Sequence, residues 1–288
     1  MSEFHRPNLS DLEWLKRILS ESQPVCCDYS AGNLLGWSIY YGEQIAEIED
    51  CLVLKSDKGN CFGFPQGKNF KKALQYIIDN FSEPLFYCLT PAECDLISAE
   101  YPDRYSFVPA RNSFDYVYRV PELATLNGKR HHGKRNHISY FEKNNNWSYE
   151  EITSDTLEEC ILMNEKWYEN NVEKDRSGIE NERMVLRFAA EHYQLLNFRG
   201  GLLRCDGEIV AFTFGEKLND STFNTHFEKA FSSVRGAYQM INKLFAQNTI
   251  NDFRFVNRED DVGLDGLRKA KLSYYPEFLV EKYRAVKK

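Results

Sequence analysis

The chain of 288 residues can form two domains or one large one, and its hydrophobic content of 42% and aromatic content of 14% suffice for buried cores. Its net charge of −7, from 36 basic and 43 acidic side chains, argues against a nucleic-acid coat protein and against DNA as a partner. No apolar run approaches the ~20 residues that span a bilayer, so no transmembrane segment is predicted.

Apolar spacing and turn residues predict a regular series of elements in the first half of the chain. Ser10-Asp11, ahead of Leu12, Leu15 and Leu19, indicates a capped helix near the N-terminus. Period-two patterns predict four strands, at 34–40, 44–48, 51–55 and 61–64. Helical spacing and further apolar runs then predict a helix at 69–81, a strand at 85–90, a short helix at 91–101 and strand material at 105–119.

The second half repeats this order. The predicted elements are a strand at 147–153, helices at 154–171 and 181–197, strands at 199–205, 208–216 and 221–228, a helix at 235–249, a strand at 252–257, a helix near 264–274 and a strand at 277–286. Each half therefore reads as antiparallel strands, helix, strand, helix and final strand, the order of the GNAT-type acyltransferase fold. We predict an α+β protein with two tandem GNAT-like domains, each a mixed, mostly antiparallel sheet flanked by helices. The expected boundaries are 1–120, a connecting basic helix or linker at 121–146, and 147–288.

Cysteine and histidine patterns give no indication of a metal. The eight cysteines form no Cys-x-x-Cys pair, which predicts neither a zinc ribbon nor a disulfide framework but a reduced, cytoplasmic protein. His131, His132 and His137 have no acid or cysteine at ligand spacing beside them. The acidic stretch 257–268 does not fit a calcium loop, because Val262 takes the glycine position and Arg268 the bidentate one. No metal site is predicted.

Two basic stretches lie on this acidic chain. Residues 129–143 hold five cations and one acid, a net charge of +4, and residues 268–288 hold seven cations and two acids, a net charge of +5. This distribution suits one phosphate-bearing ligand held in a defined place, although two solvated helix faces would give the same pattern.

The segment from 221 to 245 reads as a strand, a polar turn and a helix. Arg235-Gly236 falls at the helix start, where acyltransferases of this fold cradle the pyrophosphate of coenzyme A. The usual Gln/Arg-x-x-Gly-x-Gly/Ala pattern fits in no register, so coenzyme A stays open. Glu228 and Lys229 end the preceding strand, where the carboxylate could hold an amine or act as a general base, or form an ordinary surface ion pair. His226 would support Glu228 from the same strand face.

Three segments carry a family resemblance: LNGKRHHGKRNHISYF (126–141), HFEKAFSSVRGAYQMIN (226–242) and NREDDVGLDGLRKAKLSYYP (257–276). In this order they resemble the C-terminal catalytic domain of bacterial phosphatidylglycerol lysyltransferases, and the similarity covers nearly the whole chain. That family is built from tandem GNAT-like domains. Its characterised members take an aminoacyl group from aminoacyl-tRNA and esterify it to a phosphatidylglycerol hydroxyl. Two departures are the absence here of the family's membrane half and an acidic charge that suits an anionic membrane poorly.

The resemblance implies an acyltransferase that moves an aminoacyl group from aminoacyl-tRNA to a hydroxyl or amine, on a lipid such as phosphatidylglycerol or on a small molecule. No cofactor is required. Two alternatives stay open: an N-acetyltransferase with acyl-CoA as donor, and a non-catalytic module that binds a nucleotide or RNA. The expected location is the cytoplasm, or the inner face of the membrane as a peripheral protein.

The resemblance also implies residue roles. In the last segment, Asp261 would orient or deprotonate the acceptor, and Arg268 would hold donor phosphate or ribose. The candidate catalytic residues are Glu228, Asp261 and Tyr274. The candidate donor- and phosphate-binding residues are Lys129, Arg130, Lys134, Arg135, Asn136, Lys229, Arg235, Gly236, Asn257, Arg258, Arg268 and Lys271.

Overall fold

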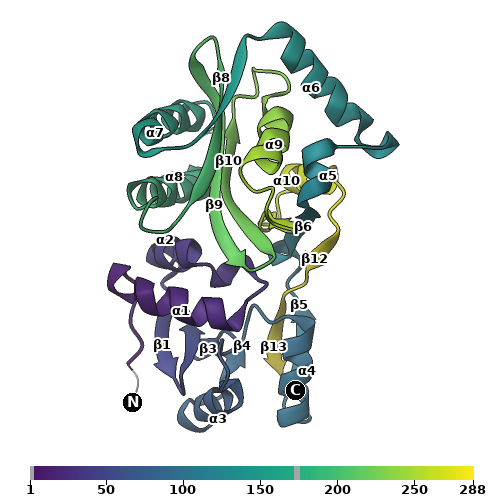
Figure 1. The fold of residues 1–288 in the computed structure, drawn as a ribbon. Helices are drawn as coiled ribbons and strands as arrows, with labels where there is room; N and C mark the ends of the chain where they lie inside the picture. The colour runs from purple at the N-terminus through teal and green to yellow at the C-terminus, as the bar shows by residue number, and fades with distance from the viewer. Residues whose placement is uncertain (1–2, 172–175) are drawn as a thin grey trace. The chain divides into compact units, whose positions relative to one another are not determined.

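The computed structural model describes residues 3–171 and 176–288, which form helices and strands along the whole chain (Figure 1). The chain separates into two compact units. Unit 1 consists of Met1–Tyr116, Glu259–Leu272 and Phe278–Lys288, and unit 2 of Val117–Arg258 and Ser273–Glu277. These boundaries differ from those expected at 120 and 147. Residues 121–146 fold within unit 2, and most of the C-terminal tail returns to unit 1 because its last strand pairs with a strand there.

Unit 1 contains two small sheets. Its helices and strands are α1 (Leu12–Ser22), α2 (Ala31–Tyr41), β1 (Gln44–Ile48), β2 (Cys51–Lys55), β3 (Cys61–Phe62), α3 (Phe70–Asn80), β4 (Leu85–Phe86), α4 (Pro91–Glu100), β5 (Tyr105–Pro109), α10 (Asp265–Leu272), β12 (Phe278–Val280) and β13 (Tyr283–Lys287). Strands β1 to β4 lie in that order, and only β3 and β4 run parallel. β13 pairs with β5 in antiparallel register, from Tyr283 opposite Pro109 to Lys287 opposite Tyr105.

The strand predicted at 34–40 is wrong, because this segment lies in helix α2. Both ends of α2 carry helix signals: the Ser30 side chain accepts a hydrogen bond from the Asn33 N–H, and Gly42 ends the helix with a φ of 69°. The apolar run between these caps is buried on several sides, so its periodicity could not separate a helix from a strand. Elsewhere in the unit the elements predicted at 44–48 and 51–55 are β1 and β2.

Other predicted elements are shorter than expected. The strands predicted at 61–64 and 85–90 contract to β3 and β4. The strand material at 105–119 divides into β5 and β6 (Asp115–Arg119), with a 3-10 turn at Arg111–Ser113 between them. The last predicted strand, 277–286, divides in the same way into β12 and β13.

Unit 2 is built on a larger sheet with helices on both faces. Besides β6, its helices and strands are α5 (Val120–Thr125), α6 (His132–Asn144), β7 (Trp147–Glu151), α7 (Ser154–Glu169), α8 (Arg176–Glu191), β8 (Arg199–Cys205), β9 (Glu208–Asn219), β10 (Thr222–Ala230), α9 (Ala237–Asn248) and β11 (Phe255–Asn257). Neighbouring strands follow the order β6-β11-β10-β9-β8-β7, and only β10 and β11 run parallel. Helices α7 and α8 lie on one side of β8 to β10 and α9 on the other (Figure 1). Strands β9 and β10 are accordingly buried at most positions on both faces.

Two glycines in unit 2 make a matched test of this packing. Gly236 starts α9 with a φ of 92°, and a Cβ there would lie 2.4 Å from the His137 carbonyl oxygen of α6. We expect Gly236→Ala to lower the free energy of unfolding by about 1–3 kcal/mol, because the substitution adds both backbone strain and a clash with main chain. Gly133, in α6, faces open space, so Gly133→Ala should cause no loss. Urea denaturation measures the free energy of unfolding of both variants. A Gly236→Ala protein as stable as the wild type would contradict the close approach of α9 to α6.

Candidate active site

A buried carboxylate stands at the end of β10 in unit 2. Glu228 Oε1 accepts a hydrogen bond from Arg258 Nη2 at 2.7 Å, and Oε2 accepts one from Asn242 Nδ2 at 3.1 Å. The side chains of Glu228 and Arg258 are only 13% and 12% exposed. Residues from β10, α9 and the end of β11 thus fix this carboxylate in one orientation. The Oδ1 atom of Asn242 is buried and has no hydrogen-bond partner among the described residues, so it remains able to accept a bond.

Aromatic rings and a second cation complete the cluster. The Arg258 guanidinium lies over the rings of Tyr118 and Tyr274, at 5.5 and 5.0 Å from their centroids. Lys134, in the first turn of α6, places Nζ 3.8 Å from the centroid of the Tyr274 ring. The same Nζ donates a hydrogen bond to Ser273 Oγ at 2.6 Å. Two cations therefore contact one buried tyrosine, beside a fixed carboxylate.

Burial shifts the acid–base behaviour of this cluster. It lowers the pKa of Lys134 to about 8, with the positive charge of Arg258 acting in the same direction and Glu228 opposing it. It raises the pKa of Tyr274 well above its usual value, so the phenol stays protonated near neutral pH. Lys134 is therefore the group whose charge changes in the physiological range, and it can both donate and accept a proton there.

This arrangement combines both signs of charge within one small region. A fixed carboxylate and a buried amide oxygen that can accept a hydrogen bond attract an ammonium group, whereas Lys134 and Arg258 favour an oxyanion or a phosphate. Four residues predicted separately from the sequence come together here: Glu228, Arg258, Lys134 and Tyr274. A fixed carboxylate beside a group that can exchange a proton is suited to general acid–base chemistry.

Other predicted residues of unit 2 lie outside the cluster. Lys229 points to the opposite face of β10, where it pairs with Glu182 at 2.6 Å and lies 3.9 Å from the centroid of the Trp167 ring. Arg235 lies over the ring of Tyr140 at 4.3 Å. Side chains alternate along a strand, and this explains why the neighbours Glu228 and Lys229 face different surroundings.

The basic residues around the start of α6 have mixed surroundings. Arg130 pairs with Glu122 at 2.5 Å, and Arg135 donates to the carbonyl oxygens of Leu126 and Gly128. Exposed Lys129 lies in the 3-10 turn before α6, and Asn136 contacts the His132 ring. Gly236 packs against α6, and Asn257 is buried in β11 opposite Val117. None of these positions excludes the predicted donor-binding roles, which stay predictions.

Asp261 and Arg268 form a separate pair within unit 1. Asp261 is 0% exposed, and its carboxylate accepts hydrogen bonds from Arg268 Nε at 2.9 Å and Nη2 at 2.8 Å. Tyr116 OH donates at 2.6 Å, the Gly263 N–H at 2.9 Å and Arg111 Nη1 at 3.3 Å. Burial alone would raise the pKa of Asp261, but the bonds from Arg268, Tyr116 and Gly263 outweigh it and hold that pKa well below its usual range. Five donors on one carboxylate are typical of a structural anchor. The role predicted for Asp261, to orient or deprotonate the acceptor, stays a prediction.

Two further features surround this pair. Lys271 donates to the main-chain oxygen of Asp260 and reaches the ring of Tyr116 at 5.8 Å. Asp260 itself is mostly enclosed, and burial raises its pKa to about 7. Glycine at 263 permits the φ of 80° that turns the chain back toward Asp261.

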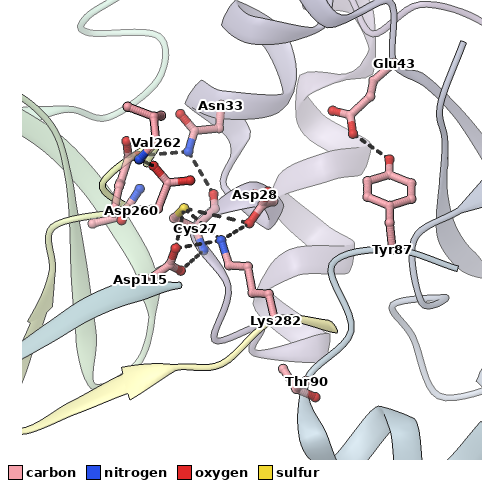
Figure 2. A network of polar contacts seen from close by, with 12 residues as sticks. Cys27, Asp28, Asn33, Glu43, Tyr87, Thr90, Asp115, Asp260, Val262 and Lys282 are labelled. Carbon is pink, nitrogen blue, oxygen red and sulfur yellow. Dashed lines mark hydrogen bonds and ion pairs between the residues drawn. The ribbon is translucent and has the colours of Figure 1, made fainter. Parts of the chain in front are cut away.

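A buried ionic cluster in unit 1 was not predicted from the sequence (Figure 2). Lys282 Nζ contacts Asp115 Oδ1 at 2.6 Å, forms an ion pair with Asp28 and donates to Cys27 Sγ at 3.5 Å. Cys27, Asp28 and Asp115 are ligand-type side chains whose atoms lie within 4.8 Å of one another. The Lys282 ammonium already stands among them and forms ion pairs with both carboxylates, so the chain itself supplies a cation at this position. In the sequence, Lys282 was only one cation of a basic stretch.

Sequence reasoning also missed three members of the unit 2 cluster: Tyr118, Asn242 and Ser273. Ser273 and Tyr274 are adjacent in the third family-like segment, so that segment contained a signal for Ser273. Tyr118 and Asn242 are ordinary strand and helix residues by pattern. Only the pairing of β6 with β11, and the position of α9 next to β10, bring them to Glu228 and Arg258.

Comparison with known proteins shows which family and which solved structures this chain resembles. The family model described as phosphatidylglycerol lysyltransferase, C-terminal, matches residues 20–286. An uncharacterised protein of Mycoplasmoides gallisepticum is 26% identical over 214 residues, which are 72% of this chain and 66% of that protein. The chain thus spans slightly under two thirds of this curated relative's length.

Among the solved structures that this chain resembles are two that cover nearly all of it. A conserved protein of unknown function from Bacteroides thetaiotaomicron is 36% identical, with a TM-score of 0.92 over 100% of both chains. L-PGS from Bacillus licheniformis is 14% identical, with a TM-score of 0.67 over 98% of this chain and 94% of that one. At this low identity the second likeness concerns the fold alone. The predicted α+β class with GNAT-like folding is confirmed.

Proposed function

Because the chain belongs to the phosphatidylglycerol lysyltransferase C-terminal family, we propose that it is an aminoacyltransferase, which moves an aminoacyl group from aminoacyl-tRNA to a hydroxyl or amine acceptor. One observation carries the proposal within this structure. Glu228, held by Arg258 and Asn242, lies in one cluster with Lys134, whose pKa is near 8. Family membership supports the reaction class, and the charges of this cluster suit that reaction.

Each group has a distinct task in the proposed transfer. The Glu228 carboxylate and the Oδ1 atom of Asn242 attract the α-ammonium group of the aminoacyl ester and orient it. Arg258 holds Glu228 in place through the 2.7 Å ion pair. Lys134 acts at the reacting carbonyl, where it can exchange a proton or stabilise negative charge on oxygen.

The donor is proposed to be aminoacyl-tRNA and not acyl-CoA. Residues 129–143 supply a local net charge of +4, from five cations and one acid, for tRNA phosphates. The start of α9 gives acyl-CoA no comparable support. The Cα of Gly236 packs against the His137 carbonyl, and the Ala237 N–H bonds the Val234 carbonyl, so this turn is engaged by its own neighbours.

The acceptor is proposed only as a hydroxyl or amine, on a lipid or a small molecule. Within the described ranges, 3–171 and 176–288, no helix has both the length and the apolar character to cross a bilayer. The test of function therefore offers both acceptor types to the same protein: vesicles that contain phosphatidylglycerol, and soluble glycerol.

We expect Glu228→Gln to lower kcat/KM for transfer from radiolabelled aminoacyl-tRNA by about 10²-fold, because the aminoacyl ammonium loses its oriented counter-ion. Glu208→Gln, an exposed acid at the start of β9, is the matched control and should transfer like the wild type. Full activity in Glu228→Gln would remove this cluster from the reaction. Consumption of acetyl-CoA but not of aminoacyl-tRNA would show an N-acetyltransferase. A thermal shift with tRNA but no turnover would show a binding module.

A further inference from the structure

Ser273 lies next to Lys134 in unit 2, and the transfer described above makes no use of its hydroxyl group. Lys134 Nζ and Ser273 Oγ are 2.6 Å apart. We propose that the two residues form a nucleophile–base pair and that Ser273 carries the aminoacyl group as a covalent ester between donor and acceptor. This inference rests on the proposed aminoacyl transfer and adds an intermediate to it.

The surrounding contacts hold Ser273 in position for this role. Ser273 begins the segment Ser273–Glu277, whose far end is fixed on β6: the Glu277 N–H donates to the Val117 carbonyl oxygen at 2.8 Å, and Arg119 pairs with Glu277 at 2.7 Å. The next residue, Tyr274, is buried under Lys134 and Arg258. Lys134 comes from the first turn of α6. Both members of the pair therefore sit on anchored main chain, as a preorganised nucleophile requires.

The chemistry of the pair fits an activated serine. A serine hydroxyl is a weak nucleophile until a base lies within hydrogen-bond reach, and lysine serves as that base in known variants of the catalytic triad. An ordinary lysine is almost fully protonated at neutral pH, but burial lowers the pKa of Lys134 to about 8. A useful fraction of neutral amine is therefore present, able to accept the serine proton.

The charged groups that face Lys134 are Arg258, which favours its neutral form, and Glu228, which favours its protonated form. The phenol of Tyr274 stays neutral, because burial raises its pKa. Its ring face, 3.8 Å from Nζ, stabilises the ammonium that forms when Lys134 takes up a proton. The site thus supports both protonation states of the lysine, which a base needs during one catalytic cycle.

The first half-reaction is balanced by these two residues. Neutral Lys134 Nζ takes the proton of Ser273 as Oγ attacks the ester carbonyl carbon. The tetrahedral intermediate then breaks the bond between the carbonyl carbon and the ribose oxygen. The Lys134 ammonium returns its proton to that oxygen, which leaves aminoacyl-Ser273 and a tRNA with a free hydroxyl.

The second half-reaction reverses these roles with the acceptor. Lys134 takes a proton from the acceptor hydroxyl or amine as that atom attacks the carbonyl of aminoacyl-Ser273. The bond to Oγ breaks, and Lys134 returns the proton to Ser273. The competing interpretation is that Lys134 only fixes Ser273 and its segment, without covalent chemistry.

Trapping the intermediate separates the two interpretations. The full chain is mixed with aminoacyl-tRNA that carries a ¹⁴C-labelled amino acid, without acceptor, and quenched in acid. We expect about one label per chain, released by hydroxylamine, with the added mass on Ser273. Ser273→Ala should lose the label and transfer at least ~10²-fold more slowly. Ser273→Cys should retain a label as a thioester, and Ser139→Ala, an exposed serine of α6, should behave like the wild type.

A second probe is independent of tRNA. A fluorophosphonate should label Ser273, at a rate that rises with pH through about 8 and falls in Lys134→Arg. Transfer to the acceptor without protein label, and with Ser273→Ala still active, would overturn the covalent step and leave the proposed function standing. Fluorophosphonate labelling with that pH profile but no use of aminoacyl-tRNA would support the nucleophile and reject the donor. Failure of both labels would overturn the inference.

Discussion

Lys282→Ala should lower the free energy of unfolding by about 3–5 kcal/mol at neutral pH. Lys282 is 1% exposed, and it stands 2.6 Å from Asp115, which is 0% exposed. Removal of the ammonium would leave the buried Asp115 carboxylate, which accepts hydrogen bonds from the Cys27 N–H at 2.9 Å and from the Cys27 thiol, without the positive charge of Lys282. The lysine also holds segments that are far apart in sequence, since Asp28, Asp115 and Lys282 meet in one cluster of unit 1 (Figure 2). Urea denaturation of both proteins measures the difference.

Two further variants make this prediction specific. Lys287→Ala removes another C-terminal lysine, one whose partner Glu83 is exposed, and it should change stability little. Asp115→Asn in a Lys282→Met background removes the uncompensated charge, so this double variant should be more stable than Lys282→Met alone. A Lys282→Ala protein as stable as the wild type would show that the buried pair contributes nothing to unit 1.

Local patterns in the sequence predicted much of unit 2. The order from β8 through β10, α9 and β11 follows from alternation, turn residues and helical spacing, all of which act over short distances along the chain. Glu228, Lys134, Arg258 and Tyr274 came from three separate segments. Only the family resemblance linked those segments, because no local rule predicts that residues more than a hundred positions apart meet. The pairing of β10 with β11 brings Glu228 near Arg258, and tertiary packing of α6 and of segment 273–277 adds Lys134 and Tyr274.

The features that sequence reasoning missed have the same physical origin. β13 pairs with β5 across more than 170 residues, so the unit boundaries could not be read from local composition. Lys282 looked like a solvated cation because its two acidic partners lie far away in sequence. The apolar run of α2 was compatible with a helix or a strand, and the helix caps at Ser30 and Gly42 are the local features that favour the helix. The pairing of β13 and the burial of Lys282 depend on tertiary contacts, which are not encoded in a short window.

Asp261→Asn should remove the part of the acid-induced loss of stability that comes from protonation of this carboxylate. The pKa of Asp261 lies far below its usual value of 3.8, because the bonds from Arg268, Tyr116 and Gly263 outweigh the effect of burial. A carboxylate whose pKa is lowered on folding stabilises the fold above the unfolded pKa and loses that contribution as the pH falls. The ionised group therefore contributes fully above about pH 5, and its contribution declines below about pH 4.

At neutral pH we expect Asp261→Asn to lower the free energy of unfolding by about 1–3 kcal/mol, since hydrogen bonds to a charged group become neutral ones. The cost should be smaller than for Lys282→Ala, because Arg268 is 27% exposed and can turn to water. The difference from the wild type should then shrink as the pH falls from 5 toward 2. Urea denaturation at pH 7, 5, 4 and 3 measures this difference in the free energy of unfolding.

The control is Asp220→Asn, which replaces an exposed acid and should show the same pH dependence of stability as the wild type. A constant difference between Asp261→Asn and the wild type at every pH would show that protonation of Asp261 is not linked to folding. A stable Asp261→Asn protein that binds aminoacyl-tRNA without turnover would instead support the catalytic role predicted from the sequence.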